Sequence, residues 1–178
     1  ADAPVTGVDD EMVGWFFSYN QVILYSFNGF YPVYILPCID DSGGYAMRNQ
    51  AIRYLILPGW QGSPADHWQS HWQNTLPAAS RVEQLDWQQP QPRDWVASLD
   101  QRLAEVGTPT ILIAHSLGCI TVARWAAQAS GHALQRVRGA LLVAPADVER
   151  DGCPQALCSF APIARQPLPF PTRVVGSS

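Results

Sequence analysis

The stretch from residue 111 to residue 119 constrains the fold more than any other part of the sequence. It reads Ile-Leu-Ile-Ala-His-Ser-Leu-Gly-Cys, an apolar run that leads to a serine with a glycine two positions later. Residues 110–114 have the β-branched and aliphatic composition of a buried strand. Residues 117–129 are rich in alanine with apolar side chains nearly all round, which indicates a buried helix. The sequence therefore predicts a strand, a sharp turn at Ser116 and a helix.

A strand, a serine turn and a helix in this order form a nucleophile elbow. There the serine has a strained backbone that exposes its hydroxyl, and small residues two positions before and after it let the strand and helix pass closely. Ala114 and Gly118 hold those two positions, so the first is alanine where glycine is usual. A five-residue pattern with one relaxed position also arises by chance in unrelated proteins. The flanking strand and helix supply the context that the motif requires, so Ser116 is the candidate nucleophile.

The chain around this motif alternates predicted strands with predicted helices. Ser63 and Pro64 have the pattern of a helix N-cap and first helical residue, and Gly107 that of a helix stop. Residues 144–171 are rich in proline and predict a long irregular connection. The strands are expected at 53–57, 81–85, 110–114, 138–143 and from 172. The other helices are expected at 64–76 and 93–106. Spacings of four put Trp68, Trp72 and Leu76 on one face of the helix at 64–76.

This alternation predicts an α/β fold with a three-layer parallel sheet of about five strands and helices on both faces. Numbered from residue 53, the strands are expected in the order 2-1-3-4-5, with the Ser116 strand in the middle. The candidate domain covers residues 47–178, because Met47 stands immediately before the first stretch that has this pattern.

Residues 1–46 differ in character from the remainder. They contain no arginine or lysine, and six of the 15 acidic residues lie there. We interpret this segment either as a non-native extension or as an accessory hairpin made of 22–27 and 30–36, with Asn28 and Gly29 as its turn.

A serine hydroxyl needs a histidine to accept its proton, an acid to orient that histidine, and an oxyanion hole. In an elbow, one oxyanion donor is the N–H of the residue after the serine, here Leu117, and the other comes from the loop after the first strand. Gly59 allows close backbone approach in that loop, so the N–H of Trp60 is the second candidate donor.

The general base is harder to find. His67 lies near the loop at 58–63, which we call the glycine loop. His115 precedes the serine, but adjacent side chains on an elbow point apart, so His115 is a poor base. Asp147 follows the fourth strand, where some enzymes of this architecture carry their acid, although a loop-capping aspartate is the ordinary alternative. We count Gly59, His67, His115 and Asp147 as candidate pocket residues, and find no convincing base.

Several other functions are disfavoured by the sequence. His67 and His71 are one helical turn apart, but Trp68 stands where a zinc protease needs glutamate, so no metal site is predicted. The two glycines of 58–62 lack the spacing of a dinucleotide or phosphate loop, so no cofactor is expected. The cationic residues are all scattered arginines and the net charge is -4, so no nucleic-acid partner is expected.

No membrane association is predicted either. Polar residues at positions 18, 20 and 21 interrupt the apolar run at 15–27, and its flank is acidic where a signal peptide would be positive. The four cysteines are expected to be reduced thiols of a cytoplasmic protein, with a disulfide between Cys153 and Cys158 as the alternative. The sequence indicates no particular protein partner.

Three segments together resemble the small cap-less α/β-hydrolases of the retinoblastoma-binding-protein-nine type, a family of bacterial serine hydrolases. They are Pro-Gly-Trp-Gln-Gly-Ser at 58–63 with Asp-His-Trp at 66–68, Ala-His-Ser-Leu-Gly at 114–118, and Leu-Val-Ala-Pro-Ala-Asp at 142–147. The resemblance covers residues 48–178.

The resemblance implies a Ser, Asp, His triad in that chain order, of which only Ser116 can be carried over. It implies that the acid follows the strand at 172, with the histidine in a Gly-His pair farther on and a last strand and helix beyond residue 178. The expectation is an incomplete copy of a serine hydrolase for a small-molecule ester or amide. The alternative is a non-catalytic binding module with the same fold.

Overall fold

The computed structural model describes residues 14–18, 21–25, 52–107 and 109–176. The chain forms two compact units, residues 1–48 and 49–178. In the first unit, β1 (Gly14–Ser18) pairs antiparallel with β2 (Gln21–Tyr25), with Ser18 opposite Gln21. The predicted strand at 22–27 overlaps β2, whose partner is β1. The predicted turn at Asn28 and Gly29 and the strand at 30–36 lie outside the described residues.

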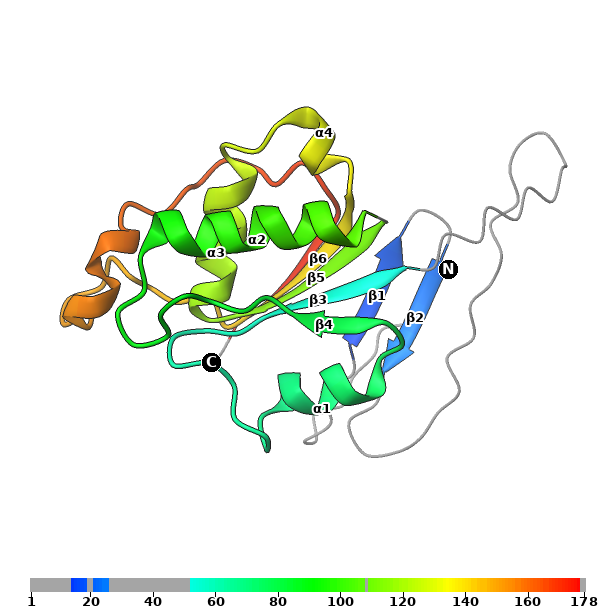
Figure 1. Ribbon diagram of the computed structural model, residues 1–178, viewed down its shortest axis with the longest axis horizontal. Coiled ribbons are helices and arrows are strands. Elements are labelled where there is room, and N and C mark those ends of the chain that lie inside the picture. Colours follow the sequence, from blue (N-terminus) through cyan, green and yellow to red (C-terminus); the bar gives the residue numbers. More distant parts are fainter. Residues whose placement is uncertain (1–13, 19–20, 26–51, 108, 177–178) are drawn as a thin grey trace, which may run out of the picture. The chain divides into compact units, whose positions relative to one another are not determined.

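The second unit is built on a parallel sheet whose strand order is β4-β3-β5-β6-β7 (Figure 1). All four neighbouring pairs run parallel. This arrangement confirms the predicted α/β class and the order 2-1-3-4-5, and it puts β5 in the middle. The strands are β3 (Arg53–Leu57), β4 (Ala79–Arg81), β5 (Thr110–His115), β6 (Val137–Val143) and β7 (Thr172–Val175).

Helices cover both faces of this sheet. Figure 1 shows α2 (Pro92–Val106) and α3 (Leu117–Ala126) on one face and α1 (Trp68–Thr75) on the other. The neighbouring Leu112 and Ile113 of β5 are 0% and 1% exposed, as expected for a central parallel strand that is covered on both sides. The short helix α4 (Gly131–Leu134) and the 3-10 helix η1 (Gln155–Phe160) complete the second unit. The sequence did not predict α4, and η1 lies within the predicted irregular connection at 144–171.

The first helix begins later than the sequence predicts. The N-cap of α1 is His67, whose Nδ1 accepts a hydrogen bond from the Gln69 N–H at 3.2 Å. Ser63 was the predicted N-cap, but its hydroxyl donates to Gln69 Oε1 at 2.8 Å. Residues 64–67 instead form a turn in which the His67 N–H donates to Pro64 O. The buried side chains of α1 are Gln69 and Ser70, while the aromatic face predicted for this helix is only partly buried.

The second strand also lies earlier than predicted, at 79–81 in place of 81–85. Ala78 has a positive φ of 54° and turns the chain into the sheet, where Ala79 pairs with Tyr54. The pairing ends once the Val82 N–H has bonded to Ile56 O. Leu85, predicted inside the strand, is 83% exposed.

The second helix agrees closely with expectation. It begins at Pro92, one residue before the predicted start, and ends at Val106, where the C-cap Gly107 has a left-handed φ of 61°. No helix in the described part of the chain is long and apolar enough to cross a membrane.

Candidate active site

Ser116 lies at a sharp bend between β5 and α3. Its φ is 50° and its ψ is -117°, a conformation that costs a non-glycine residue about 1–3 kcal/mol. Three backbone hydrogen bonds hold it: the Ser116 N–H donates to Val143 O at 3.0 Å, and Ser116 O accepts from the N–H groups of Cys119 and Ala146. The side chain is half-buried. The predicted sharp turn is therefore present, at the carboxyl edge of the sheet.

Gly118 shows why the motif needs a small residue after the serine. A Cβ at this position would lie 2.5 Å from Leu57 O and 2.8 Å from Pro58 O. The first turn of α3 therefore runs against the carboxyl end of β3, with no room for a side chain. Ala114 on the other side of the serine is fully buried.

Gly59 brings the loop after β3 directly onto the serine. A Cβ at Gly59 would lie 2.8 Å from Ser116 Cβ and 3.3 Å from Ser116 Oγ. The next residue, Trp60, is anchored because its Nε1 donates to Gln88 O at 3.0 Å. Gln61 adds a second anchor by donating its N–H to Trp87 O at 3.1 Å. These contacts fix the backbone of the loop beside the hydroxyl.

Leu117, the other candidate oxyanion donor, is the first residue of α3 and is fully buried. The first N–H groups of a helix have no partner within the helix, and the helix dipole adds partial positive charge there. This end of α3 can therefore stabilise negative charge that develops next to Ser116.

Gln69 is a site residue that the sequence analysis missed. It is 0% exposed, and its Nε2 donates to Leu57 O at 3.0 Å and to Ile113 O at 3.1 Å. Since Oε1 accepts from the Ser63 hydroxyl, one amide joins β3, β5 and the glycine loop. No sequence signal distinguishes it, because a glutamine in the first turn of a helix is usually exposed.

Arg81 at the end of β4 also hydrogen-bonds to the glycine loop. Its Nη1 donates to Ser63 O at 2.9 Å and its Nη2 to Ser70 Oγ at 2.8 Å. Its Nε donates to Gln73 Oε1. The guanidinium therefore links the glycine loop to α1.

His115 and His67 lie together on the α1 side, with ring centroids 5.0 Å apart. Burial lowers the pKa of His115, and the charge of His67 lowers it further. Burial also lowers the pKa of His67, as does Arg81, while Asp66 acts in the opposite direction. Both imidazoles are therefore biased toward the neutral form, which is the form that can accept a proton.

Neither ring is engaged with the nucleophile. His115 packs edge-on against Trp68 at 6.0 Å, and within the described residues no histidine side chain hydrogen-bonds to Ser116. All four histidines of the sequence are described, and the other two, His71 and His132, are exposed. Asp147 is exposed too, and its Oδ1 accepts from the Glu149 N–H at 3.1 Å, which is the arrangement of a loop-capping aspartate.

The connection after β6 packs over the start of α3. Its residues Val148, Leu157 and Phe160 form a buried cluster with Leu117 and with the neighbouring helices. Arg124 Nη2 fastens this connection to α3 by donating to Phe160 O at 2.7 Å. Leu117 in the first turn of α3 is accordingly 0% exposed.

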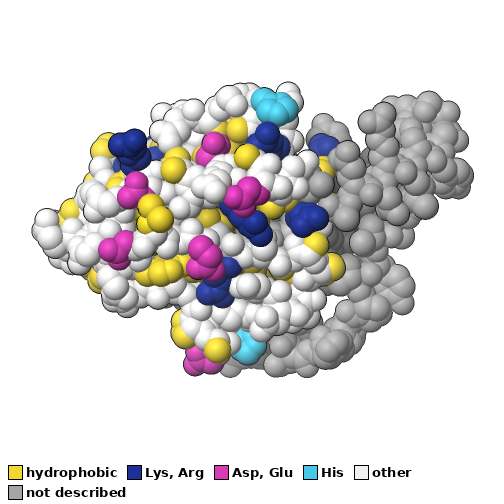
Figure 2. Space-filling view, in the orientation of Figure 1, with side chains coloured by type: hydrophobic (Ala, Val, Ile, Leu, Met, Phe, Trp, Pro, Cys, Tyr) yellow, Lys and Arg dark blue, Asp and Glu magenta, His cyan; other side chains and the backbone are white. Residues whose placement is uncertain are grey.

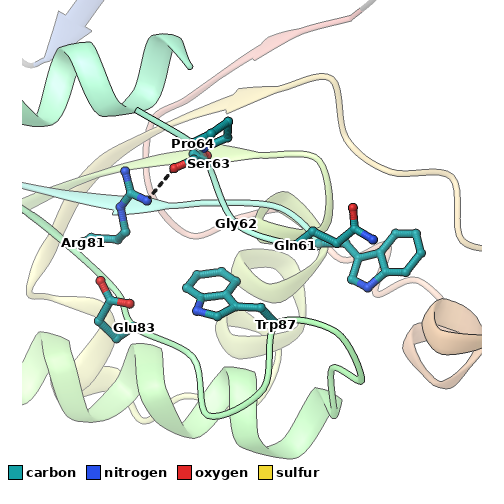
Figure 3. A pocket seen from close by; sticks show the side chains of 8 residues that line it. Gln61, Gly62, Ser63, Pro64, Arg81, Glu83 and Trp87 are labelled. Carbon is teal, nitrogen blue, oxygen red and sulfur yellow. Dashed lines mark hydrogen bonds between the residues drawn. The ribbon is translucent and has the colours of Figure 1, made fainter. Parts of the chain in front are cut away.

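A cavity of about 510 Å³ opens between residues 60–64 and residues 81–87 (Figure 3). Trp60 and Trp87 provide its aromatic walls, and Arg81 and Glu83 its charged groups. Trp68 does not line this cavity. Figure 2 shows arginines and acidic side chains interleaved on the face in view. The described residues hold no group of three or more His, Cys, Asp or Glu side chains suited to a metal ion.

Known proteins are similar to this chain in sequence and in fold. The serine hydrolase family profile matches residues 54–178, and no curated protein matches the chain. A protein from Pectobacterium atrosepticum SCRI1043 assigned as a YdeN-like hydrolase is 30% identical, with a TM-score of 0.58 over 71% of this chain and 63% of that one. The ydeN gene product of B. subtilis is 26% identical, with a TM-score of 0.43 over 52% of this chain and 51% of that one.

The chain thus spans less than two thirds of the Pectobacterium hydrolase. The family match covers more than half of the sequence and includes the Ser116 elbow. On this evidence the chain belongs to the serine hydrolase family.

Proposed function

We propose that the second unit is the catalytic fold of a hydrolase for small-molecule carboxylic esters or amides, with Ser116 as nucleophile. The N–H groups of Leu117 and Trp60 form its oxyanion hole. Within the serine hydrolases we assign it to the cap-less type that the sequence resembles, with the domain beginning at residue 47 and a cytoplasmic location.

One observation carries the proposal: the Gly59 backbone lies against the Ser116 side chain. A hydroxyl held at a helix N-terminus beside a glycine loop has both the exposure and the donors that acyl transfer requires. Removing one such donor typically costs about a hundred- to a thousandfold in rate.

The general base is the incomplete part of the site. No histidine in the described part is hydrogen-bonded to Ser116, so we infer that the chain reacts slowly. Serine hydrolases stripped of their triad still retain about 10³–10⁴-fold acceleration from the oxyanion hole and binding.

Labelling by a fluorophosphonate probe tests this assignment on the chain as printed. We expect slow labelling that requires Ser116, and acceleration by added imidazole, which supplies the missing base. Ser116→Ala is the matched control, because it removes the hydroxyl and retains the side-chain Cβ. The same variant also measures the background signal from the probe and imidazole, which is subtracted from the labelling of the parent protein.

The outcomes separate enzyme from binding module. Imidazole-dependent labelling lost in Ser116→Ala supports a formed nucleophile and oxyanion hole without a base. Fast labelling without imidazole contradicts the missing base, and His115→Gln and His67→Gln would then identify the residue that acts. No labelling at any imidazole concentration, with the protein folded by circular dichroism, favours the non-catalytic module.

A further inference from the structure

Two thiols lie close together in the connection between β6 and β7. Cys153 is half-buried and Cys158 is exposed, and both are free. The sulfurs approach the same carbonyl, since Cys153 Sγ is 3.7 Å and Cys158 Sγ 3.6 Å from Pro154 O. Cys158 Sγ is also 4.0 Å from Cys153 O. The chain therefore curls at the start of η1 so that both thiols face the same side.

We propose that Cys153 and Cys158 form a thiol–disulfide exchange site, which small disulfides of the glutathione class oxidise to an intramolecular disulfide. This site is separate from the Ser116 elbow and does not depend on the function proposed for it. Cysteines that lie close together and reach solvent are the ones that exchange, because the attacking thiolate must be accessible.

The reaction proceeds in two exchange steps. The exposed Cys158 thiolate attacks one sulfur of the small disulfide, which forms a mixed disulfide and releases the first small thiolate. The Cys153 thiolate then attacks Cys158 Sγ, which closes the protein disulfide and releases the second. The two protons lost by the cysteines pass to the released thiolates, so the cysteines lose two electrons and the small disulfide gains two.

The environments of the two thiols fix this order. Cys158 is exposed, so it meets the small disulfide first. Burial raises the pKa of Cys153, and the neighbouring Cys158 raises it further. The closing step therefore accelerates as pH rises, because more Cys153 is then ionised.

Cys119 provides an internal control within the same chain. It is 2% exposed, and burial raises its pKa to about 12. Its sulfur also donates to Val143 O at 3.4 Å. A buried and protonated thiol is not a nucleophile for exchange, so Cys119 should remain reduced while the pair is oxidised.

The pair is connected to the buried cluster over α3. Cys153 packs against the cluster that includes Leu117 and Phe160, and Arg124 holds Phe160 O. A bond between Cys153 and Cys158 would therefore clamp the first turn of η1 where it covers the start of α3.

Mass spectrometry of the 178-residue chain tests the proposal, in a Cys38→Ser background because Cys38 lies outside the described residues. Trypsin cleaves after Arg150 and Arg165, and the sequence has no lysine, so one peptide, 151–165, carries both cysteines. After incubation with oxidised glutathione and acid quenching, we expect this peptide to lose about 2 Da, the mass of two hydrogens. Two molecules of reduced glutathione should appear per chain, at a rate that increases with pH.

Two variants assign the steps. Cys153→Ser should stop at a stable mixed disulfide on Cys158, with one glutathione bound per chain. Cys158→Ser should react at least about tenfold more slowly, since the remaining thiol is half-buried and its ionisation is disfavoured. Circular dichroism of both variants verifies that they are folded.

Three results would overturn the proposal. The first is a stable glutathione adduct in the parent protein, because it would show that Cys153 cannot reach the mixed disulfide. The second is a disulfide-linked dimer, and the third is a peptide 151–165 that keeps both free thiols.

Discussion

Replacing Gly59 by alanine tests whether the loop after β3 lies on the serine. The added Cβ would be 2.8 Å from Ser116 Cβ, whereas ordinary contacts of this kind are 3.4–4 Å. Gly59 does not have a positive φ, so alanine adopts its backbone conformation without strain and the cost is steric. Overpacking of this kind costs about 1–3 kcal/mol in the free energy of unfolding.

A double-mutant cycle with Ser116→Gly isolates this contact. Glycine at position 116 removes both the Cβ and the Oγ that the new methyl group would meet, and of the three nearest atoms it leaves His115 O at 3.3 Å. The cost of Gly59→Ala should therefore fall by at least about 1 kcal/mol in the Ser116→Gly background. Ser116→Gly alone should stabilise the protein by about 1 kcal/mol, because glycine accepts the positive φ.

Gly118→Ala is the matched control for this cycle. Its Cβ would meet backbone carbonyls, Leu57 O at 2.5 Å and Pro58 O at 2.8 Å, so Ser116→Gly cannot relieve it. We expect a loss of about 3 kcal/mol in both backgrounds. Urea denaturation followed by tryptophan fluorescence measures all six proteins. If Gly59→Ala costs the same with serine and with glycine at position 116, the loop does not contact the serine and the reasoning fails.

The elbow could be predicted because its determinants are local. The apolar strand, Ser116 and Gly118 occupy nine consecutive residues, and the structure shows a steric reason for the glycine. The parallel sheet and its right-handed crossovers follow from the alternation of strands and helices. These features need no knowledge of distant contacts.

The start of α1 could not be predicted because a distant contact decides it. Ser63 followed by Pro64 has the local chemistry of a helix start, but the Ser63 hydroxyl is bonded to the amide of Gln69. That amide is held in turn by Ile113 O of β5, 44 residues along the chain. The predicted strand at 81–85 is also wrong at its end. Its pairing with β3 stops at Ile56 and Arg81, so Leu85 has no strand beside it and is exposed. In both cases tertiary contacts override a local preference.

The histidines show the same limit for the site itself. Position in the sequence indicates that His115 adjoins the serine, but only the structure shows its ring packed against His67 and Trp68. Side-chain direction at the end of a strand depends on what covers the sheet there. The role of a residue next to the nucleophile therefore cannot be derived from spacing alone.

Two further substitutions test the buried polar groups around the elbow. Gln69→Leu leaves Leu57 O, Ile113 O and the Ser63 hydroxyl without their partner, which should cost about 1–3 kcal/mol in urea denaturation. The exposed Gln101→Leu should change stability by less than about 0.5 kcal/mol, and equal losses would argue against a structural role for the buried amide. The lowered pKa of His115 predicts that the free energy of unfolding depends on pH. This pKa is lowered from 6.5 in the folded state, so below about pH 6.5 the unfolded chain binds more protons than the folded chain. The stability due to the neutral ring is present above that pH and is lost as pH falls toward the folded-state pKa, so His115→Gln should flatten the decline measured between about pH 7.5 and 5. An unchanged slope in this variant would mean that burial does not hold the ring neutral, and that His115 lies closer to solvent than its packing against α1 indicates.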